Sequence, residues 1–478
     1  MLEEFYSEYT EALDEGYAAL FAGAGLSQPS GFVNWKELMK DIANDLGLNV
    51  DVETDLIALA QYHVNTRAGR ARLDKLLIKE FTKDTKITES HRLIASLPLH
   101  TVWTTNYDTL IEEAFKEANK RPDVKITQKN LGTTLPRRDV TIYKMHGDIS
   151  QPENAVLTKE DYETYTLTRP FFPELLKGDL LSKTFLFVGF SFTDPNIDYI
   201  LSRIRTLMGQ DRRDHYCIMR HVPKPKSKSG KAKAQYEYDK KKLELRIGDL
   251  KRYGIHALMV EEYSEIETIL QELNRRSHRK DIFVSGSAHE YGSMGRDRVE
   301  SLARAIGQEI IQKGYNLISG FGLGVGGAVI IGSAEALYAD EQSSIDERTR
   351  LRPFPQEPPQ GMTRKQFWTK YREDMISNSG FAIFLCGNKL DSSTNKTVIA
   401  DGVLEEFEIA KRLGKYPIPI GATGYAAREI WKEVTGSLDQ FYPMGGVKGH
   451  FKTLEDENKS NAEIIDAIFA ITKRVVPK

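Results

Sequence analysis

The stretch that decides the fold of this chain is Leu20-Phe21-Ala22-Gly23-Ala24-Gly25-Leu26-Ser27, where a short apolar run breaks into Gly-x-Gly and a hydroxyl residue. The apolar run predicts a buried strand. The glycines would let the backbone approach a pyrophosphate closely, with the N–H groups that follow facing the anion. Alone, this pattern is weak evidence for nucleotide binding, because Gly-x-Gly is common and the third glycine of the dinucleotide fingerprint is absent.

Three further stretches strengthen the prediction, because each of them follows an apolar, strand-like run. They are Thr104-Thr105-Asn106-Tyr107-Asp108, Met145-His146-Gly147-Asp148 and Val188-Gly189-Phe190-Ser191. An open α/β sheet gathers its ligand site at the carboxyl ends of its strands. Helical patterns separate these strands, which predicts a mostly parallel, Rossmann-like sheet with flanking helices. From residue 35 to residue 81 the pattern is helical only, so we expect a helical insertion there.

The length and composition of the chain limit what it can be. Its 478 residues are too many for one ordinary domain, and 40% hydrophobic with 28% charged residues is typical of a globular protein with an ample core. A net charge of −2 gives no reason to expect nucleic acid or an anionic membrane as a partner. No apolar run approaches the roughly 20 residues of a membrane span, and no signal-peptide pattern is present. We therefore expect a cytoplasmic protein.

The two cysteines, Cys217 and Cys386, lie far apart in apolar, strand-like contexts. Two cysteines at this separation exclude a disulfide framework and a Cys-x-x-Cys zinc ribbon, and no bound metal is expected. The favoured interpretation is that both are buried as small hydrophobic residues.

Residues 222–242 form a basic run rich in Ser, Pro and Gly at its start. Such a run is most often a solvated surface loop, and a nucleic-acid patch is the less favoured alternative.

A second α/β domain is expected after the charged joint at residues 275–280, which predicts one domain over 1–280 and another over 281–478. The first strand of the second domain runs into Gly286-Ser287. The next strand runs into Gly320-Phe321-Gly322-Leu323-Gly324-Val325-Gly326-Gly327. A glycine-rich loop of this kind either cradles phosphate or packs a helix closely. Residues 339–362 are predicted to be an inserted loop.

Together, Gly23-Ala24-Gly25-x-Ser27, Thr105-Asn106-x-Asp108 and His146-Gly147 resemble the sirtuin family in order and approximate spacing, over most of residues 1–275. The resemblance implies an NAD-binding catalytic domain in which Asn106 and His146 carry the chemistry. The implied NAD contacts are Ala22, Gly23, Ala24, Gly25, Ser27, Asn106, Asp108, His146, Gly189 and Ser191.

The residue types suit that chemistry. Cleavage of the bond between ribose and nicotinamide passes through a transition state like an oxocarbenium ion. Nicotinamide is cationic at its ring nitrogen and leaves neutral, so one base and a way to hold the ribose suffice. Histidine is suited to act as a base near neutral pH, and Asn106 can orient a ribose hydroxyl or the attacking water. The alternatives are a structural role for His146 and a helix N-cap at Asn106.

One departure from the sirtuin pattern decides the expected reaction. Sirtuin deacylases carry a cysteine zinc ribbon beside the cleft, which this chain cannot build with two distant cysteines. Water is therefore the expected acceptor, and NAD+ is a substrate to be hydrolysed. A zinc-free protein deacylase or ADP-ribosyltransferase is the alternative within enzymes. A non-enzymatic, nucleotide-sensing scaffold is the alternative from another class.

The second domain resembles the SLOG group, which includes the Lonely Guy nucleotide hydrolases. The resemblance rests on the glycine-rich loops, Arg372-x-x-Met375 and Leu404-Glu405-Glu406. A polar insertion after Cys386-Gly387-Asn388-Lys389 splits the hydrolytic loop of that group, so we expect binding without turnover. Arg372 and Lys389 are candidates to pair with a diphosphate. The implied ligand residues are Gly286, Ser287, Gly322, Gly324, Arg372, Lys389 and Glu405.

A sirtuin-like domain followed by a non-hydrolytic SLOG domain resembles the Thoeris antiphage effector family, in both domains and in their order. The resemblance implies an NAD+ hydrolase whose SLOG domain binds a cyclic ADP-ribose isomer made by a partner TIR-domain protein. Binding would release NAD hydrolysis and deplete cellular NAD. It also implies self-association, as a homotetramer or a larger assembly.

Overall fold

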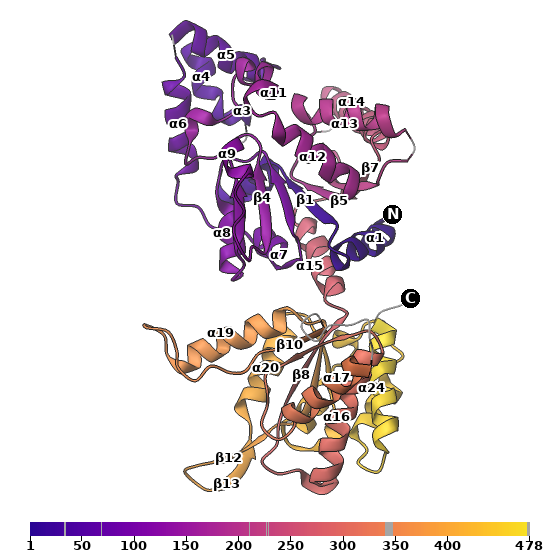
Figure 1. Cartoon of the computed structure of the whole chain (residues 1–478). Coiled ribbons are helices and arrows are strands. Elements are labelled where there is room, and N and C mark those ends of the chain that lie inside the picture. The colour runs from indigo at the N-terminus through magenta and orange to yellow at the C-terminus, as the bar shows by residue number, and fades with distance from the viewer. Residues whose placement is uncertain are drawn as a thin grey trace. The chain divides into compact units, whose positions relative to one another are not determined.

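The computed structural model describes residues 1–32, 35–67, 69–209, 211–225, 227, 229–339 and 348–475. The chain divides into two compact units, residues 1–274 and residues 275–478, and each is built on a parallel sheet flanked by helices (Figure 1). The division falls a few residues before the predicted boundary. Helix α15 (Glu265–Ser277) extends into the predicted joint, so the first part of that joint is helical. The predicted α/β fold class is confirmed.

The sheet of unit 1 has seven strands in the order β3-β4-β2-β1-β5-β6-β7, and all neighbouring strands are parallel. Edge strand β3 was not predicted, because its Pro-Asp-Val-Lys sequence carries no apolar run. The strands are β1 (Ala18–Ala22), β2 (Thr101–Thr104), β3 (Pro122–Lys125), β4 (Val140–Lys144), β5 (Thr184–Val188), β6 (His215–Arg220) and β7 (Ile255–Val260).

Strand β1 is buried on both faces, because its successive side chains point into two different apolar layers. Leu20 and Ala22 pack into one core, and Ala19 and Phe21 into the other. The first core is covered by α1 (Leu2–Asp14), α7 (Glu89–Ser96), α8 (Leu110–Glu117) and α15. The second is covered by α12 (Phe171–Ser182), α13 (Pro195–Met208) and α14 (Gly230–Lys251).

The segment between β1 and β2 is helical, as predicted. It begins with the one-turn helix α2 (Ala24–Ser27) and the short 3-10 helix η1 (Gln28–Ser30), and continues as α3 (Trp35–Leu38), α4 (Lys40–Asp45), α5 (Leu56–Arg67), α6 (Ala71–Phe81) and α7. Helices α3 to α6 enclose a small core of their own, which also takes in Tyr107 and Leu157. The insertion is therefore tied to the segments that follow β2 and β4. Three short helices complete the unit, namely α9 (Gln128–Leu131), α10 (Lys159–Glu163) and α11 (Tyr165–Thr168).

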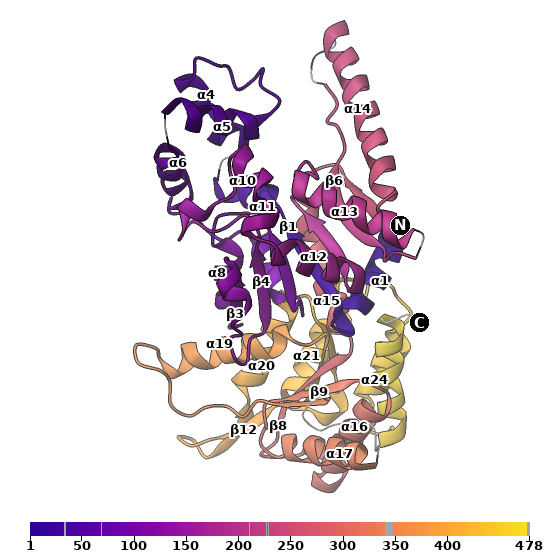
Figure 2. The same ribbon diagram turned by 45° about the horizontal axis from the view of Figure 1, so that its top comes forward.

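The loop prediction for residues 222–242 is wrong for most of the run. Helix α14 begins at Gly230, where the side chain of Ser229 accepts a hydrogen bond from the amide of Ala232. Lysine and alanine are good helix formers, so one capped start is enough to continue the basic run as a helix. Among the residues of α14, Leu250 is buried, and the amino-terminal part of the helix projects from unit 1 (Figure 2).

The sheet of unit 2 has five parallel strands in the order β10-β9-β8-β11-β14. Strand β10 lies within the predicted inserted loop, and residues 340–347 of that loop are outside the described residues. The polar insertion is an antiparallel hairpin of β12 and β13. The strands are β8 (Asp281–Ser287), β9 (Asn316–Ser319), β10 (Thr349–Leu351), β11 (Phe381–Cys386), β12 (Asn388–Asp391), β13 (Lys396–Ile399) and β14 (Tyr416–Pro419). The helices are α16 (Arg296–Gln312), α17 (Gly326–Ala339), α19 (Arg364–Ser377), α20 (Asp401–Arg412), α21 (Tyr425–Gly436), α22 (Leu438–Phe441), α23 (Lys448–Glu455) and α24 (Asn461–Val475).

Both cysteines are buried and free, as predicted, and burial raises the pKa of each thiol to about 12. Within the described ranges, no cluster of three or more His, Cys, Asp or Glu side chains is arranged to hold a metal ion. None of the described helices combines the length and the apolar composition that crossing a membrane requires.

Candidate functional site

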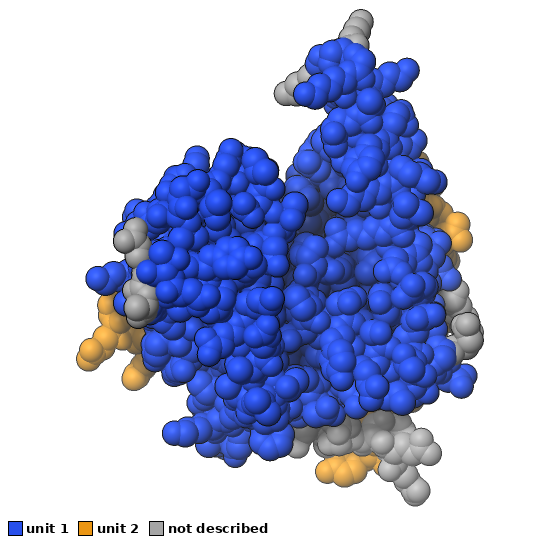
Figure 3. Space-filling model, turned by 90° about the horizontal axis from the view of Figure 1, so that it is seen from above, with its two compact units in different colours: residues 1–274 blue, residues 275–478 orange. Residues whose placement is uncertain are grey.

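The four predicted motifs of unit 1 follow β1, β2, β4 and β5, which are neighbours in the sheet in the order β4-β2-β1-β5. Because the strands are parallel, the loops that carry these motifs meet at one edge of the sheet. Seen from above, a groove crosses unit 1 between the side that carries α4 to α6 and the side that carries α13 and α14 (Figure 3).

The predicted glycines of unit 1 bring two of these loops into direct backbone contact. A Cβ atom on Gly23 would lie 2.5 Å from the carbonyl oxygen of Gly189, and a Cβ on Gly189 would collide with the amide nitrogen of Leu26. The amides of Gly23 and Gly25 donate to the carbonyls of Val188 and Gly189, both at 2.9 Å. The glycines therefore join the loop after β1 to the loop after β5, a packing role in addition to the predicted approach to a pyrophosphate.

Asn106 lies buried after β2 with its side-chain amide held in one orientation. Its Nδ2 donates to the carbonyl of Gly23 and to Oγ of Ser27, both at 3.1 Å. Its Oδ1 is buried and has no hydrogen-bond partner among the described residues. A buried acceptor without a donor is costly, so Oδ1 is suited to accept a hydrogen bond from a ligand hydroxyl. The N-cap interpretation is wrong, because α8 begins at Leu110 and its N-cap position is Thr109.

Asp108 belongs to the same buried network as Asn106. It receives a hydrogen bond from Ser27 and another from the amide of Leu110, the latter at 3.1 Å. Burial raises the pKa of the Asp108 carboxyl, although Lys144 and these donors oppose the shift. Ser27 thus links Asn106 to Asp108, and three of the predicted residues form one hydrogen-bonded chain.

His146 follows β4 and is nearly buried. Its Nε2 lies 3.1 Å from Oδ2 of Asp194, a residue in the loop after β5. The carboxylate of Asp194 therefore faces this ring nitrogen of His146. The rings of Tyr162 and Tyr165 meet the imidazole edge-on, with centroids 5.6 and 6.3 Å away.

The remaining predicted residues of this site are placed as follows. Ala22 is the buried last residue of β1, and Ala24 is exposed at the start of α2. Ser191 is exposed, and its hydroxyl shares a 2.7 Å hydrogen bond with that of Thr193. The structure therefore joins Gly23, Gly25, Ser27, Asn106, Asp108 and Gly189 in one contact network. His146 is linked to the loop that carries Gly189 through Asp194.

Sequence reasoning missed a buried charge cluster next to the Asn106 and His146 loops. Lys144, at the end of β4, is fully buried, with its Nζ 2.8 Å from Oε1 of Glu112 and in contact with Asp148. The same Nζ donates to the carbonyl of Asp108. Burial alone would lower the pKa of Lys144, but the two carboxylates raise it above its ordinary value. A lysine within the strand run Val-Thr-Ile-Tyr-Lys was the one available signal in the sequence.

Asp194 was also missed, although the sequence carries a signal for it. An Asp followed by Pro before a helical pattern is typical of a helix start. Oδ1 of Asp194 caps α13 by accepting from the amides of Asn196 and Ile197, at 2.9 and 3.1 Å. Although burial favours the neutral acid, His146 and these amides hold the pKa of Asp194 below its ordinary value.

In unit 2 the predicted glycines again pack backbone against backbone. A Cβ on Gly322 would collide with the carbonyl of Gly286, and a Cβ on Gly286 would lie 2.5 Å from the carbonyl of Leu385. Gly324 has a φ of +78°, and its Cβ would lie 2.5 Å from the carbonyl of Ala288. These contacts hold the loops after β8 and β9 close to the end of β11, at one edge of the sheet.

Arg372 is buried on α19 and already engaged by carboxylates. Its Nη1 lies 2.8 Å from Glu405 and its Nε 3.3 Å from Glu406, while the guanidinium stands over the ring of Phe354 at 5.0 Å. Glu406 in turn accepts a 2.5 Å hydrogen bond from Ser285 on β8. The guanidinium predicted to bind a diphosphate is therefore already paired with two carboxylates.

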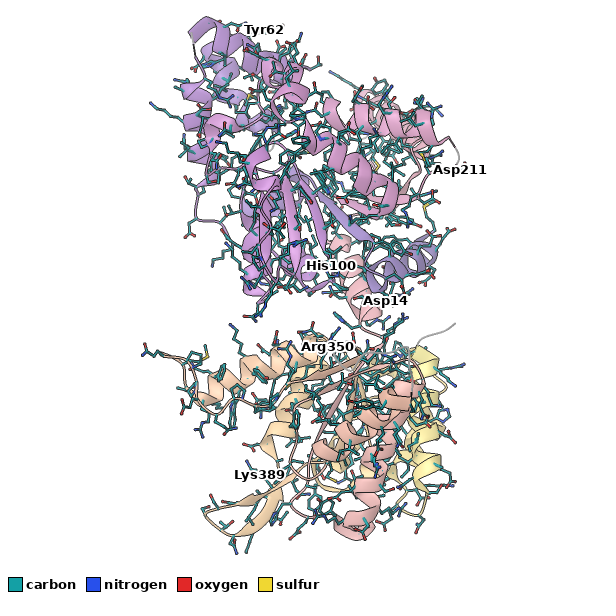
Figure 4. The ribbon with its side chains drawn as sticks, viewed as in Figure 1. Asp14, Tyr62, His100, Asp211, Arg350 and Lys389 are labelled. Atoms are coloured by element: carbon teal, nitrogen blue, oxygen red, sulfur yellow. The ribbon has the colours of Figure 1, made fainter. Side chains whose placement is uncertain are left out.

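Lys389 lies in the β12–β13 hairpin (Figure 4). Its side chain pairs with Asp401, the first residue of α20. The neighbouring Asn388 ties this hairpin to β8. Its carbonyl accepts a 3.0 Å hydrogen bond from Ser287, and its Oδ1 accepts from the amide of His289 at 2.8 Å. The hairpin that splits the hydrolytic loop thus brings Lys389 close to Ser287.

The sequence matches two known families, one in each unit. Residues 100–245 match the SIR2-like domain, and residues 265–475 match the Sir2- and TIR-associating SLOG family. The NAD(+) hydrolase ThsA of Bacillus cereus (strain MSX-D12) is 44% identical, over 98% of this chain and 97% of that protein. The protein of the same name from Acinetobacter baumannii (strain 532279) is 42% identical over 97% of each chain. Defense-associated sirtuin 2 of Bacillus subtilis is 28% identical over 43% of this chain and 21% of its own length.

Proposed function

Because this chain belongs to the ThsA family of NAD(+) hydrolases, we propose that unit 1 cleaves NAD+ to nicotinamide and ADP-ribose, with Asn106 and His146 as catalytic residues. The observation that carries this assignment is the buried Oδ1 of Asn106, which has no hydrogen-bond partner in the described part of the chain and lies at the sheet edge that also holds His146. NAD+ would lie in the groove of Figure 3, with its pyrophosphate against the loops joined by Gly23 and Gly189.

In the proposed reaction, water adds to the anomeric carbon of the ribose as the bond to nicotinamide breaks. The electron pair of that bond returns to the ring nitrogen, so nicotinamide leaves as a neutral molecule. His146 takes the proton that the attacking water loses. Asn106 Oδ1 accepts a hydrogen bond from a ribose hydroxyl or from the water and orients it for attack. The product is ADP-ribose with a free anomeric hydroxyl.

Turnover of NAD+ by the purified full-length chain tests this function against its alternatives. Release of free nicotinamide and ADP-ribose from NAD+ alone, with water as the sole acceptor, is the expected result. A requirement for an acylated peptide would instead indicate a deacylase, and transfer of ADP-ribose to protein an ADP-ribosyltransferase. If no acceptor and no candidate activator gives turnover, the result would favour a non-enzymatic, nucleotide-sensing scaffold.

Chelation of divalent metals is expected to leave NAD+ cleavage unchanged, because the proposed chemistry needs a base and a ribose-orienting amide only. The measurement is the turnover rate before and after EDTA treatment and gel filtration, with metal analysis of the active fraction. Full activity without stoichiometric zinc is the expected outcome. Loss of activity that added zinc restores would contradict the proposed mechanism.

For unit 2, we propose that it binds a cyclic ADP-ribose isomer made by a TIR-domain protein, and that binding activates unit 1. The match to a Sir2- and TIR-associating SLOG family supports this role. So do the close-packed glycine loops and the two cations near the ends of β8 and β11. The ligand has to bind the active arrangement more tightly than the resting one, because equal affinity for both would shift nothing. Self-association of the chain belongs to the same proposal.

Arg372→Ala and Lys389→Ala are each expected to raise the ligand concentration for half-maximal activation by roughly 10- to 100-fold, because each removes a hydrogen bond to a charged group. The measurement is a titration of NAD+ turnover with a panel of cyclic ADP-ribose isomers. Lys396→Ala, an exposed change in the same hairpin, is the matched control. Superimposable curves for wild type, Arg372→Ala and Lys389→Ala would exclude both side chains from ligand recognition.

A further inference from the structure

We propose that Asp194 is a positioning residue for His146: it fixes the imidazole and directs which ring nitrogen accepts the proton during NAD+ cleavage. The inference rests on the proposed role of His146 as the base. Asp194 lies in the loop after β5, whereas His146 follows β4, so the pair joins loops that β2 and β1 separate in the sheet.

The pair is shielded from water. The exposed fraction is 5% for the side chain of His146 and 9% for that of Asp194, and their Nε2 and Oδ2 atoms are 3.1 Å apart. An opposite charge at this distance acts more strongly in a site that excludes water than on an exposed surface. Among the described residues, the titratable side chains in contact with the imidazole are Asp194, Tyr162 and Tyr165. Of these, Asp194 alone carries a negative charge near neutral pH.

The carboxylate of Asp194 is itself held in place. One of its oxygens caps α13, and the other faces His146. Oδ1 accepts hydrogen bonds from the backbone amides of Asn196 and Ile197 at the start of α13. Oδ2 faces Nε2 of His146 and also lies 3.4 Å from the hydroxyl of Tyr162. A group fixed by backbone amides can define the orientation of the imidazole, as carboxylates do for histidines in other active sites.

The chemical consequence concerns the tautomer of His146. A carboxylate facing Nε2 favours the proton on that nitrogen, which leaves Nδ1 unprotonated and free to accept a proton from the attacking water. When Nδ1 takes the proton, the ring becomes an imidazolium cation, and the negative charge of Asp194 stabilises it. Asp194 thereby acts on the reaction through His146 and does not itself contact NAD+.

The competing explanation is that Asp194 serves as a helix cap and nothing more. Asn and Asp are about equally good N-caps, so Asp194→Asn keeps the cap and removes the charge. Asp198→Asn, at an exposed position of the same helix, is the matched control for charge loss. Thermal unfolding of both variants checks that α13 and the fold are intact.

The test compares wild type, Asp194→Asn, Asp198→Asn and His146→Ala as full-length chains. The kcat and KM for NAD+ are measured from pH 5 to 9, a range that brackets the ordinary histidine pKa of about 6.5. Each variant is assayed without activator and with the most strongly activating cyclic ADP-ribose isomer. For Asp194→Asn we expect kcat to fall by about 10- to 100-fold with little change in KM. The acid limb of its kcat profile should also move to lower pH, because an imidazole without its carboxylate is protonated less readily.

Unchanged kcat and an unchanged acid limb in Asp194→Asn, with His146→Ala inactive, would overturn the positioning role and leave the proposed function standing. A fall in kcat without movement of the acid limb would reduce Asp194 to a structural role and also overturn the inference. Full activity of His146→Ala would overturn both this inference and the catalytic assignment on which it rests.

Discussion

Replacing His146 by alanine is expected to lower the rate of NAD+ cleavage by about 10²- to 10⁴-fold, because a positioned general base contributes a factor of that size. The change should leave the fold intact, since the contacts of the imidazole within the described residues are with the carboxylate of Asp194 and with two tyrosine rings. The measurement is nicotinamide release under single-turnover conditions, with the melting temperature recorded alongside.

His100→Ala is the matched control for this prediction. His100 is exposed and directly precedes β2, so it lies at the amino end of the strands, away from the proposed site (Figure 4). Its replacement should leave turnover unchanged. Near-normal turnover in His146→Ala would remove His146 from the mechanism.

Asn106→Ala should lower the rate to a similar extent, for a different reason. It removes the acceptor Oδ1 and also the two Nδ2 hydrogen bonds to Gly23 and Ser27. Asn106→Asp separates these effects, because it keeps an acceptor and the size of the side chain but loses both donors. If both variants retain near-normal turnover, Asn106 does not orient the ribose or the water.

Replacing Lys144 by methionine is expected to lower the free energy of unfolding of unit 1 by about 3–5 kcal/mol, which is the usual cost of removing one partner from a buried ion pair. Lys144 is fully buried, and Glu112 and Asp148 would be left in the interior without their cation. Its Nζ also holds the carbonyl of Asp108, so the loop that carries Asn106 should lose a tether.

Urea denaturation of the full-length chain measures this effect, with the two units followed as separate transitions where they resolve. Lys177→Met is the control, because its pairing with Glu174 on α12 at 3.4 Å is a surface contact. Surface ion pairs contribute about 0–1 kcal/mol to the free energy of unfolding. Lys144→Met/Glu112→Gln should recover part of the loss by removing one uncompensated charge. A loss no greater than that of Lys177→Met would mean that the cluster is not a stabilising network.

The sequence by itself determined the α/β class, the central strands of both sheets and the order in which the glycine, asparagine and histidine motifs follow those strands. Strands such as β1 and β5 were predictable because a parallel strand covered on both faces must be a continuous apolar run. The same reasoning failed for β3 and β10, since edge strands need no such run. It also failed for the start of α14, where a local cap at Ser229, rather than apolar periodicity, begins the helix.

Only the tertiary structure decided which side chains meet. The pair of His146 and Asp194 and the cluster of Lys144 with Glu112 join residues that no periodicity connects. Likewise, the engagement of Arg372 by Glu405 depends on how α19 packs on α20. Hydrophobic patterning records which face of an element is buried, and turn residues record where it ends. The partner of a buried charge is set by the packing of elements distant in the chain, and local sequence does not encode it.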